Sequence, residues 1–216
     1  MSKDYQKRAK KEFNLFRQIF QWITCTLVYG LYCKVVFGLS IEGRKNIPRN
    51  GFCIVASNHV SAIDPFLVAY AVQKPVAFMA KMELFEKKIM RFFLDLLGAF
   101  AVNRAKLSPS TIKTAHTIKQ TNWLLGIFPQ GTRERDDNLE NVNKGFASFA
   151  KTLKCDIIPI GIIGAAKEKR KAFKSKMKIK IGEPIKYTDN VEEMIKLWSS
   201  KIVELIEGNK NEPEKR

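Results

Sequence analysis

The fold of this chain can be read outward from residues 56–65, which run ASNHVSAIDP. They follow residues 51–55 (GFCIV), a short apolar run that begins with glycine and predicts a buried strand. Residues 66–72 (FLVAYAV) predict a helix, with Asp64 as its N-cap and Pro65 at its first position. His59 would therefore lie in the loop that leaves a strand, which is where open α/β sheets place their chemistry.

His59 and Asp64 are the candidate catalytic pair. The helix N-terminus is the positive end of the helix dipole, so it favours an ionised Asp64. A carboxylate beside His59 can keep one imidazole nitrogen protonated and leave the other free as a base. Helix capping alone would also account for Asp64, so the assignment depends on what the rest of the chain contains.

Strand and helix patterns alternate along the rest of the chain, which predicts an α/β domain with a mostly parallel or mixed sheet flanked by helices. His116 falls on one of the expected helices, where we expect it to be structural or exposed. We expect a basic and hydrophobic N-terminal membrane anchor at 1–39, the α/β domain at 40–207 and a polar tail at 208–216. Further strands are expected at 40–43, 76–80, 99–102, 123–128, 157–163 and 176–182, and further helices at 84–97, 108–120, 143–153 and 191–206.

Composition restricts the class of partner and the compartment. The 216 residues carry a formal charge of +17, which predicts an anionic partner such as nucleic acid, anionic lipid or a phosphorylated substrate. The four cysteines form no C-x-x-C pair and lie in apolar runs, as is usual for reduced, buried thiols, so we expect a reducing compartment. With only two histidines in the chain, we expect no metal site.

The N-terminal region contains a long apolar run, residues 19–39 (IFQWITCTLVYGLYCKVVFGL). Its length just suffices to span a bilayer. Gln21 and Lys34 interrupt it, Gly30 divides it, and basic residues flank both ends, against the positive-inside tendency of a single span. This pattern favours a two-helix anchor dipped into one leaflet. A helical hairpin packed on the domain core is the alternative.

Three further motifs follow expected strands. Residues 98–104 (GAFAVNR) end in Arg104, whose guanidinium suits a phosphate, and residues 158–160 (IPI) place a proline in an apolar strand. In residues 128–133 (FPQGTR), Gly131 lets the backbone turn close to a ligand. Main-chain N–H groups, the Thr132 hydroxyl and the Arg133 guanidinium would then donate to an anion.

With the Asn-His-x-Ser-x-x-Asp pattern of residues 58–64, these four blocks occur in the order found in glycerolipid acyltransferases. The chain thus resembles the 1-acyl-sn-glycerol-3-phosphate (lysophosphatidic acid) acyltransferase family. Gln130 departs from the family pattern, which usually has Glu there. The uncharged side chain bears on which acceptor is preferred more than on the class of reaction.

The resemblance implies transfer of a fatty acyl group from a thioester to the free hydroxyl of 1-acyl-glycerol-3-phosphate, giving phosphatidic acid in phospholipid biosynthesis. It implies no cofactor or metal, and acyl-CoA or an acyl carrier protein thioester as co-substrate. Glycerol-3-phosphate and other lysolipids are alternative acceptors. We expect the protein at the cytoplasmic leaflet of the cell membrane, as a peripheral or monotopic protein. The resemblance assigns catalysis to His59 and Asp64 and substrate binding to Arg104, Gln130, Gly131, Thr132 and Arg133.

Two other functions fit parts of the pattern less well. A Ser61–His59–Asp64 hydrolase would be expected to carry a Gly-x-Ser-x-Gly elbow, which does not occur. The charge permits a nucleic-acid-binding protein, but no recognition motif is present and the apolar run has no use on DNA, so we expect no nucleic-acid partner.

Residues 167–180 hold eight bases and one acid, which suits a second membrane contact or a docking site for an acidic acyl donor.

Overall fold

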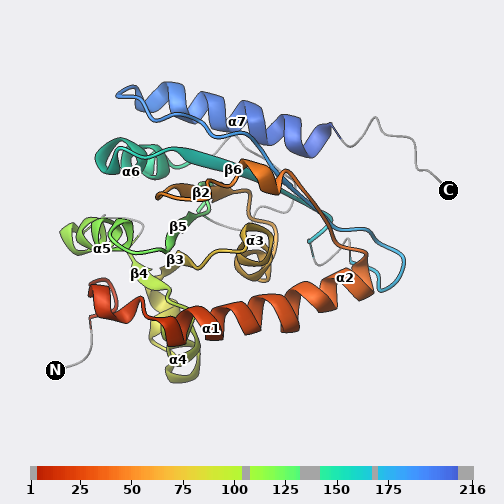
Figure 1. Ribbon diagram of the computed structural model, residues 1–216, viewed down its shortest axis with the longest axis horizontal. Helices are drawn as coiled ribbons and strands as arrows, with labels where there is room; N and C mark the ends of the chain where they lie inside the picture. Colours follow the sequence, from red (N-terminus) through yellow and green to blue (C-terminus); the bar gives the residue numbers. More distant parts are fainter. Residues whose placement is uncertain (1–3, 104–107, 132–141, 167–169, 209–216) are drawn as a thin grey trace.

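The computed structural model describes residues 4–103, 108–131, 142–166 and 170–208, which form a seven-stranded sheet in the order β1-β7-β6-β2-β5-β3-β4 (Figure 1). All neighbouring strands are parallel except β6 and β7, so the sheet is mixed, as predicted. The strands are β1 (Ser40–Glu42), β2 (Ile54–Ser57), β3 (Val76–Lys81), β4 (Phe100–Val102), β5 (Leu124–Ile127), β6 (Ile157–Ile163) and β7 (Lys178–Ile181).

Helices cover both faces of the sheet, and the strand residues divide between two hydrophobic clusters. Ile54 and Ala56 pack in the cluster of α5, α6 and α7, whereas Val55 packs in the cluster of α2 and α3. Strands buried on both faces account for the continuous apolar runs in the sequence. The helices are α1 (Leu15–Ile23), α2 (Leu31–Phe37), α3 (Asp64–Val72), α4 (Lys88–Leu96), α5 (Pro109–Lys119), α6 (Gly145–Leu153) and α7 (Val191–Glu207), with the 3-10 turns η1 (Lys10–Glu12), η3 (Arg44–Asn46) and η4 (Met82–Phe85) and the π-helical segment η2 (Thr24–Gly30).

Pro159 lies in a central strand, where a missing N–H would normally interrupt a ladder. Its carbonyl oxygen accepts from Gly182 N–H at 2.9 Å and so faces β7. In a strand the nitrogen and the carbonyl oxygen of one residue point to the same side, so the ring nitrogen of Pro159 faces β7 as well. On that side the regular pairing begins only at Ile160↔Ile181, and the next bridge is Ile157↔Ile185. The proline therefore occupies a gap in the antiparallel ladder and costs no hydrogen bond.

The predicted two-helix anchor divided at Gly30 is not found, because α1, η2 and α2 run on as one helix. Gly30 itself has right-handed helical backbone angles, φ −64° and ψ −53°. A Cβ atom at this position would lie 2.5 Å from Cδ2 of Tyr70 in α3. The glycine allows close approach of two helices, and the run Lys10–Phe37 is the single helix among the described residues long and apolar enough to cross a membrane.

One face of this N-terminal helix packs on the domain. Its buried stripe includes Cys25, Cys33 and Phe37. The Gln21 side chain is also buried: Nε2 donates to Val76 O at 2.8 Å and to Leu97 O at 2.7 Å, while Oε1 accepts from Val76 N–H at 2.8 Å. Gln21 thus satisfies main-chain groups at the start of β3.

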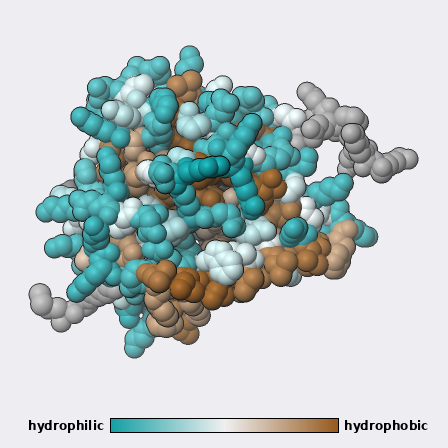
Figure 2. Space-filling model, in the orientation of Figure 1, coloured by the Kyte–Doolittle hydropathy of each residue, from teal (hydrophilic) through white to brown (hydrophobic). Residues whose placement is uncertain are grey.

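The opposite face of the helix is exposed and apolar, and it forms the brown band along the lower edge of Figure 2. At Leu15 and Phe16 the exposed fractions are 68% and 65%. The other exposed apolar residues of the helix are Ile19, Trp22, Ile23, Leu27, Val28, Leu31, Tyr32 and Val35.

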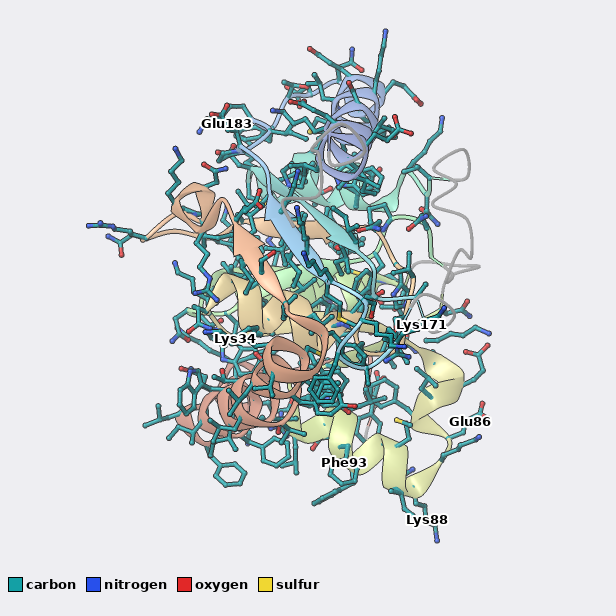
Figure 3. The ribbon with its side chains drawn as sticks, turned by 90° about the vertical axis from the view of Figure 1, so that its right-hand side faces the viewer. Lys34, Glu86, Lys88, Phe93, Lys171 and Glu183 are labelled. Atoms are coloured by element: carbon teal, nitrogen blue, oxygen red, sulfur yellow. The ribbon has the colours of Figure 1, made fainter. Side chains whose placement is uncertain are left out.

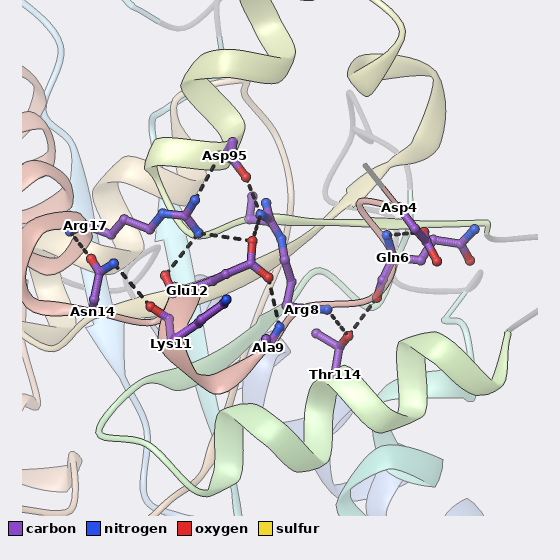
Figure 4. A network of polar contacts seen from close by, with 11 residues as sticks. Asp4, Gln6, Arg8, Ala9, Lys11, Glu12, Asn14, Arg17, Asp95 and Thr114 are labelled. Carbon is purple, nitrogen blue, oxygen red and sulfur yellow. Dashed lines mark hydrogen bonds and ion pairs between the residues drawn. The ribbon is translucent and has the colours of Figure 1, made fainter. Parts of the chain in front are cut away.

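Charged side chains connect the N-terminal segment to α4 (Figure 4). Arg17 Nη2 donates to Asp95 Oδ2 at 2.8 Å, and the buried Arg8 guanidinium pairs with the other oxygen of Asp95. Arg8 Nη1 also donates to Glu12 Oε1 at 3.0 Å. Both oxygens of Asp95 are therefore used to hold α4 beside the first helix.

The single helix predicted at residues 84–97 is instead the turn η4 followed by α4. Lys87 separates them with an extended backbone, φ −77° and ψ 115°. The break allows Phe85 to turn inward, where its ring lies 5.2 Å from that of Tyr5. No residue of α4 is buried, so its apolar residues do not form the core-facing stripe that their spacing suggests.

Candidate active site

The candidate site lies at the carboxyl edge of the sheet, where two adjacent parallel strands end. β2 ends at Ser57 and is followed by the loop that carries His59. β5 pairs with β2, with Ala56 opposite Ile127, and is followed at once by Phe128. Since neighbouring parallel strands end on the same edge, His59 and Gln130, which are 71 residues apart in the sequence, meet here.

His59 and Asp64 form the predicted pair. Nδ1 of His59 lies 2.8 Å from Oδ2 of Asp64. The Asp64 side chain is wholly buried, and the His59 side chain is 12% exposed. The carboxylate can only accept, so Nδ1 carries the proton and Nε2 keeps its lone pair. No hydrogen bond from the described residues occupies Nε2, which leaves a positioned base at the edge of the sheet.

Asp64 is not the helix cap that the sequence predicts. α3 begins at Asp64 itself, and Ile63 holds the N-cap position without a side-chain hydrogen bond. The oxygen Oδ2 turns back instead and accepts the N–H groups of Val60 and Ser61, each at 2.7 Å. The N-terminus of α3 needs no cap from this side chain, because Pro65 has no N–H and the N–H groups of the next two residues donate to Ile63 O.

Asn58 fixes the start of the loop, a role that sequence reasoning missed. It is wholly buried; its Nδ2 donates to Ile162 O at 2.9 Å and its Oδ1 accepts from Ile162 N–H at 2.7 Å. The side chain thus extends the pairing of β2 with β6 past the end of the strand. Trp198 of α7 adds a second support, since its Nε1 donates to Ala56 O at 3.0 Å. The position of Asn58, directly before His59 in the motif, was the available signal.

Phe128 supports the imidazole ring from the neighbouring loop, and it too was missed. The rings of His59 and Phe128 are stacked, with centroids 4.2 Å apart and planes at 22°. Phe128 stacks in turn on Phe78, at 5.5 Å and 12°. The His59 ring is therefore restrained by the Asp64 carboxylate at one edge and by an aromatic face.

Gln130 contacts the catalytic loop directly. Its Oε1 accepts the main-chain N–H of His59 at 2.7 Å, and only 6% of the residue is exposed. Either an amide or a carboxylate oxygen can accept this bond, so replacement of the family's usual Glu by Gln preserves it. This contact gives Gln130 a role in holding the loop, in addition to the substrate-binding role that the sequence predicts.

The other predicted binding residues are only partly described. Gly131 has a φ of 72°, a conformation that suits glycine, and its N–H donates to Phe128 O at 2.9 Å. That N–H closes the turn, so it is not free to donate to an anion. Arg104, Thr132 and Arg133 lie outside the described residues.

Other candidate nucleophiles do not join the pair. Ser61 contributes its main-chain N–H to Asp64, and within the described residues no hydrogen bond joins its hydroxyl to His59. His116 is exposed on α5, as predicted. The four cysteines are free and buried, and burial raises the pKa of Cys53 and of Cys155 to about 12, so these two thiols stay protonated at neutral pH.

Comparison with known proteins places the sequence in a family. A model of the family described as Acyltransferase matches residues 38–163. A 1-acyl-sn-glycerol-3-phosphate acyltransferase of Bacillus subtilis is 31% identical over 153 residues, 70% of this chain and 76% of that protein. One of Streptococcus pneumoniae is 32% identical over 138 residues, 63% of this chain but only 51% of its own length.

A solved structure shares the fold. The crystal structure of the 1-acyl-sn-glycerophosphate (LPA) acyltransferase PlsC from Thermotoga maritima superimposes with a TM-score of 0.67, covering 95% of this chain and 100% of that one at 23% identity. At this identity the likeness concerns the fold alone.

Proposed function

The chain belongs to the acyltransferase family, and from this premise we propose that it transfers a fatty acyl group from a thioester to the free hydroxyl of a 1-acyl-glycerol-3-phosphate, giving phosphatidic acid. The observation that carries the proposal is the His59–Asp64 pair at the carboxyl edge of β2, with Nδ1 and Oδ2 2.8 Å apart. The names of the relatives supply the acceptor.

In the proposed reaction His59 acts as general base. Nε2 takes the hydroxyl proton as the acceptor oxygen attacks the thioester carbonyl carbon. Collapse of the tetrahedral intermediate breaks the carbon–sulfur bond, and the imidazolium returns the proton to the departing sulfur. Asp64 fixes the tautomer and stabilises the imidazolium. The thioester is already activated, so no acyl-enzyme is required.

Substrate binding follows the motifs that the resemblance assigns. Arg104, Thr132 and Arg133 would hold the acceptor phosphate, since guanidinium groups bind phosphate through paired hydrogen bonds. Gly131 and Gln130 would shape the turn that presents them. We propose acyl-CoA or an acyl carrier protein thioester as the donor, with no metal or other cofactor.

We also propose that the N-terminal helix lies in the plane of one leaflet, the cytoplasmic one. Its lengthwise packing supports this: residues from Gln21 to Phe37 are buried against the domain along one face, and Gln21 is bonded to the main chain of β3. A helix that crossed the bilayer would have to leave the domain along most of its length. The exposed face is apolar, as an interfacial helix requires.

The test of catalysis is His59→Ala. Loss of a general base typically lowers the rate ~10²–10⁴-fold, and we expect a loss in this range in an acyl-transfer assay over a panel of acceptors. His116→Ala is the matched control, because His116 is exposed on α5 and should leave turnover unchanged. Circular dichroism and vesicle binding should be the same in both variants. Near-normal turnover by folded His59→Ala protein would sink the mechanism.

A further inference from the structure

A second apolar surface lies beside the N-terminal helix, on α4. The exposed fractions are 77% for Ile89, 61% for Phe92 and 49% for Phe93. In Figure 3 α4 and the N-terminal helix lie at the same end of the molecule, and Phe93 points away from the body of the protein there. Nothing in the described part of the chain covers these side chains.

A third apolar group lies at the other end of the N-terminal helix. Phe173 is 77% exposed, in a backbone conformation that bulky residues rarely adopt, φ 59°. Its N–H donates to Val36 O at 2.7 Å, which ties it to the end of α2. An exposed aromatic ring held in an uncommon conformation indicates a constraint unrelated to core packing.

Polar contacts connect these three apolar surfaces. Asp95 of α4 pairs with Arg8 and Arg17 at the start of the N-terminal helix, and Phe173 is hydrogen-bonded at its end. The α4 surface and Phe173 are therefore each bonded to the N-terminal segment, one near each end of the helix.

We propose that α4 and Phe173 are two further contacts with an anionic bilayer surface, so that the protein rests on the membrane at three places. This inference rests on the proposed function, in which the N-terminal helix lies in one leaflet. A single in-plane helix leaves a protein free to roll about the helix axis. The α4 contact, which lies to one side of the helix (Figure 3), opposes this rolling, and Phe173 adds a contact at the far end of the helix. Together they would hold the carboxyl edge of the sheet, with His59, at one orientation to the lipid head groups.

Charge identifies lipid as the occupant. Exposed bases adjoin both contacts: Lys87 and Lys88 at the start of α4, and Lys171 and Lys174 on either side of Phe173. Aromatic rings with lysines beside them suit the boundary between acyl chains and anionic head groups. A second copy of this chain would bring the same bases and a net charge of +17, which opposes self-association through this face.

The experiment compares two variants with a matched control. Phe92→Ser/Phe93→Ser removes the α4 contact and Phe173→Ser removes the other. Leu197→Ser/Val203→Ser changes apolar residues of α7 that are 41% and 39% exposed, on the opposite side of the molecule from the N-terminal helix (Figure 1). Sedimentation with vesicles containing phosphatidylglycerol should show binding weakened ~10-fold by the α4 pair and several-fold by Phe173→Ser. The control should bind as wild type does.

Activity gives the second measurement. Both test variants should lose activity on acceptor embedded in vesicles, in proportion to their binding, and keep wild-type activity on a short-chain acceptor in solution. Unchanged vesicle binding in the two test variants would overturn the inference, as would an equal loss in the control. A wild-type dimer that either variant dissociates would identify a second copy as the occupant and overturn it as well. A further outcome is that wild-type protein acylates no acceptor while the two test variants bind vesicles more weakly than wild type does. In that case the proposed function fails and the membrane contacts stand.

Discussion

At the scale of single residues, one oxygen of Asp64 organises the loop of the candidate site. Oδ2 accepts from His59 Nδ1 and from the N–H groups of Val60 and Ser61, while Oδ1 is buried without a hydrogen-bond partner among the described residues. Removing the side chain would leave two main-chain donors buried. The carboxylate therefore serves both the conformation of the loop and the tautomer of the base.

Asp64→Asn and Asp64→Ala should separate these two contributions. An Asn oxygen can still accept from Val60 and Ser61, so we expect it to cost less stability than Ala, which leaves both donors unsatisfied at ~1–3 kcal/mol each. Both variants should lose most turnover, because neither stabilises the imidazolium. Thermal unfolding and acyl-transfer rates provide the measurements. An Asn variant as destabilised as the Ala variant would contradict the assigned hydrogen bonds.

Gln130 allows a prediction on the role of the amide that replaces the family's usual carboxylate. Gln130→Glu keeps an acceptor for His59 N–H and should retain turnover within a few-fold. Gln130→Met has similar size but no comparable acceptor, so we expect a ~10-fold or larger fall in kcat and a loss of roughly 1–3 kcal/mol in stability. A Met variant that changed only the acceptor KM would show that Gln130 binds substrate and does not position the loop.

At the scale of elements, the N-terminal helix packs directly on the helix that begins with Asp64. Tyr29 stacks on Phe66 of α3, with ring centroids 4.0 Å apart and planes at 13°. The next residue, Gly30, lies against the ring of Tyr70, which is also in α3. These contacts fall in the π-helical segment η2, and such segments are frequent at functional sites. The helix that we propose lies on lipid is thus in contact with the helix that supports the base.

Gly30→Ala tests this packing, because helix propensity and packing predict opposite signs. Propensity alone would favour Ala by ~1 kcal/mol. The added Cβ would lie 2.5 Å from the Tyr70 ring, so we expect a net loss of ~1–3 kcal/mol in thermal or denaturant unfolding. Adding Tyr70→Ala should make room for the methyl group, so the Gly30→Ala change should cost less in that background. A stabilising effect of Gly30→Ala alone would refute close packing of η2 on α3.

At the scale of the whole molecule, depth measurements can decide how the N-terminal helix meets the bilayer. Trp22 is 52% exposed, whereas Trp123 and Trp198 are fully buried, so lipids brominated at known depths should quench Trp22 selectively. In the variant Trp22→Phe/Leu31→Trp the reporter moves nine positions along the same exposed face. An in-plane helix predicts equal depths for the two reporters. A helix that crosses the bilayer predicts a difference of roughly 13 Å.

The same scale shows how much of the core the N-terminal region supplies. Cys33 and Phe37 belong to the cluster beneath the sheet, and Phe13 packs against Trp123 on the other side. Removing residues 1–39 should therefore destabilise the domain as well as release it from membranes. Outward-facing substitutions are a cleaner way to weaken membrane binding, since they leave these contacts intact.

Local pattern alone determined much of this protein. The alternation of strand and helix segments and the placement of His59 between a strand and a helix both follow from short-range periodicity and from glycine and proline positions. The match of residues 38–163 to an acyltransferase model agrees with the motifs that suggested the family. These features involve residues close together in the chain, so the sequence carries them directly.

Tertiary structure decided what depends on distant neighbours. Gln130 reaches His59, Phe128 stacks on its ring and Asn58 bonds to Ile162 only because β5 and β6 lie on either side of β2. Asp64 turned back from its helix because nearby main-chain groups satisfied the helix end instead. The same reason explains α4 and Gly30. For α4, periodicity shows that apolar residues share a face, but only packing decides whether that face meets the core or the solvent. For Gly30, the sequence shows that a glycine interrupts an apolar run, but only packing decides whether the glycine bends the helix or makes room for a neighbouring ring.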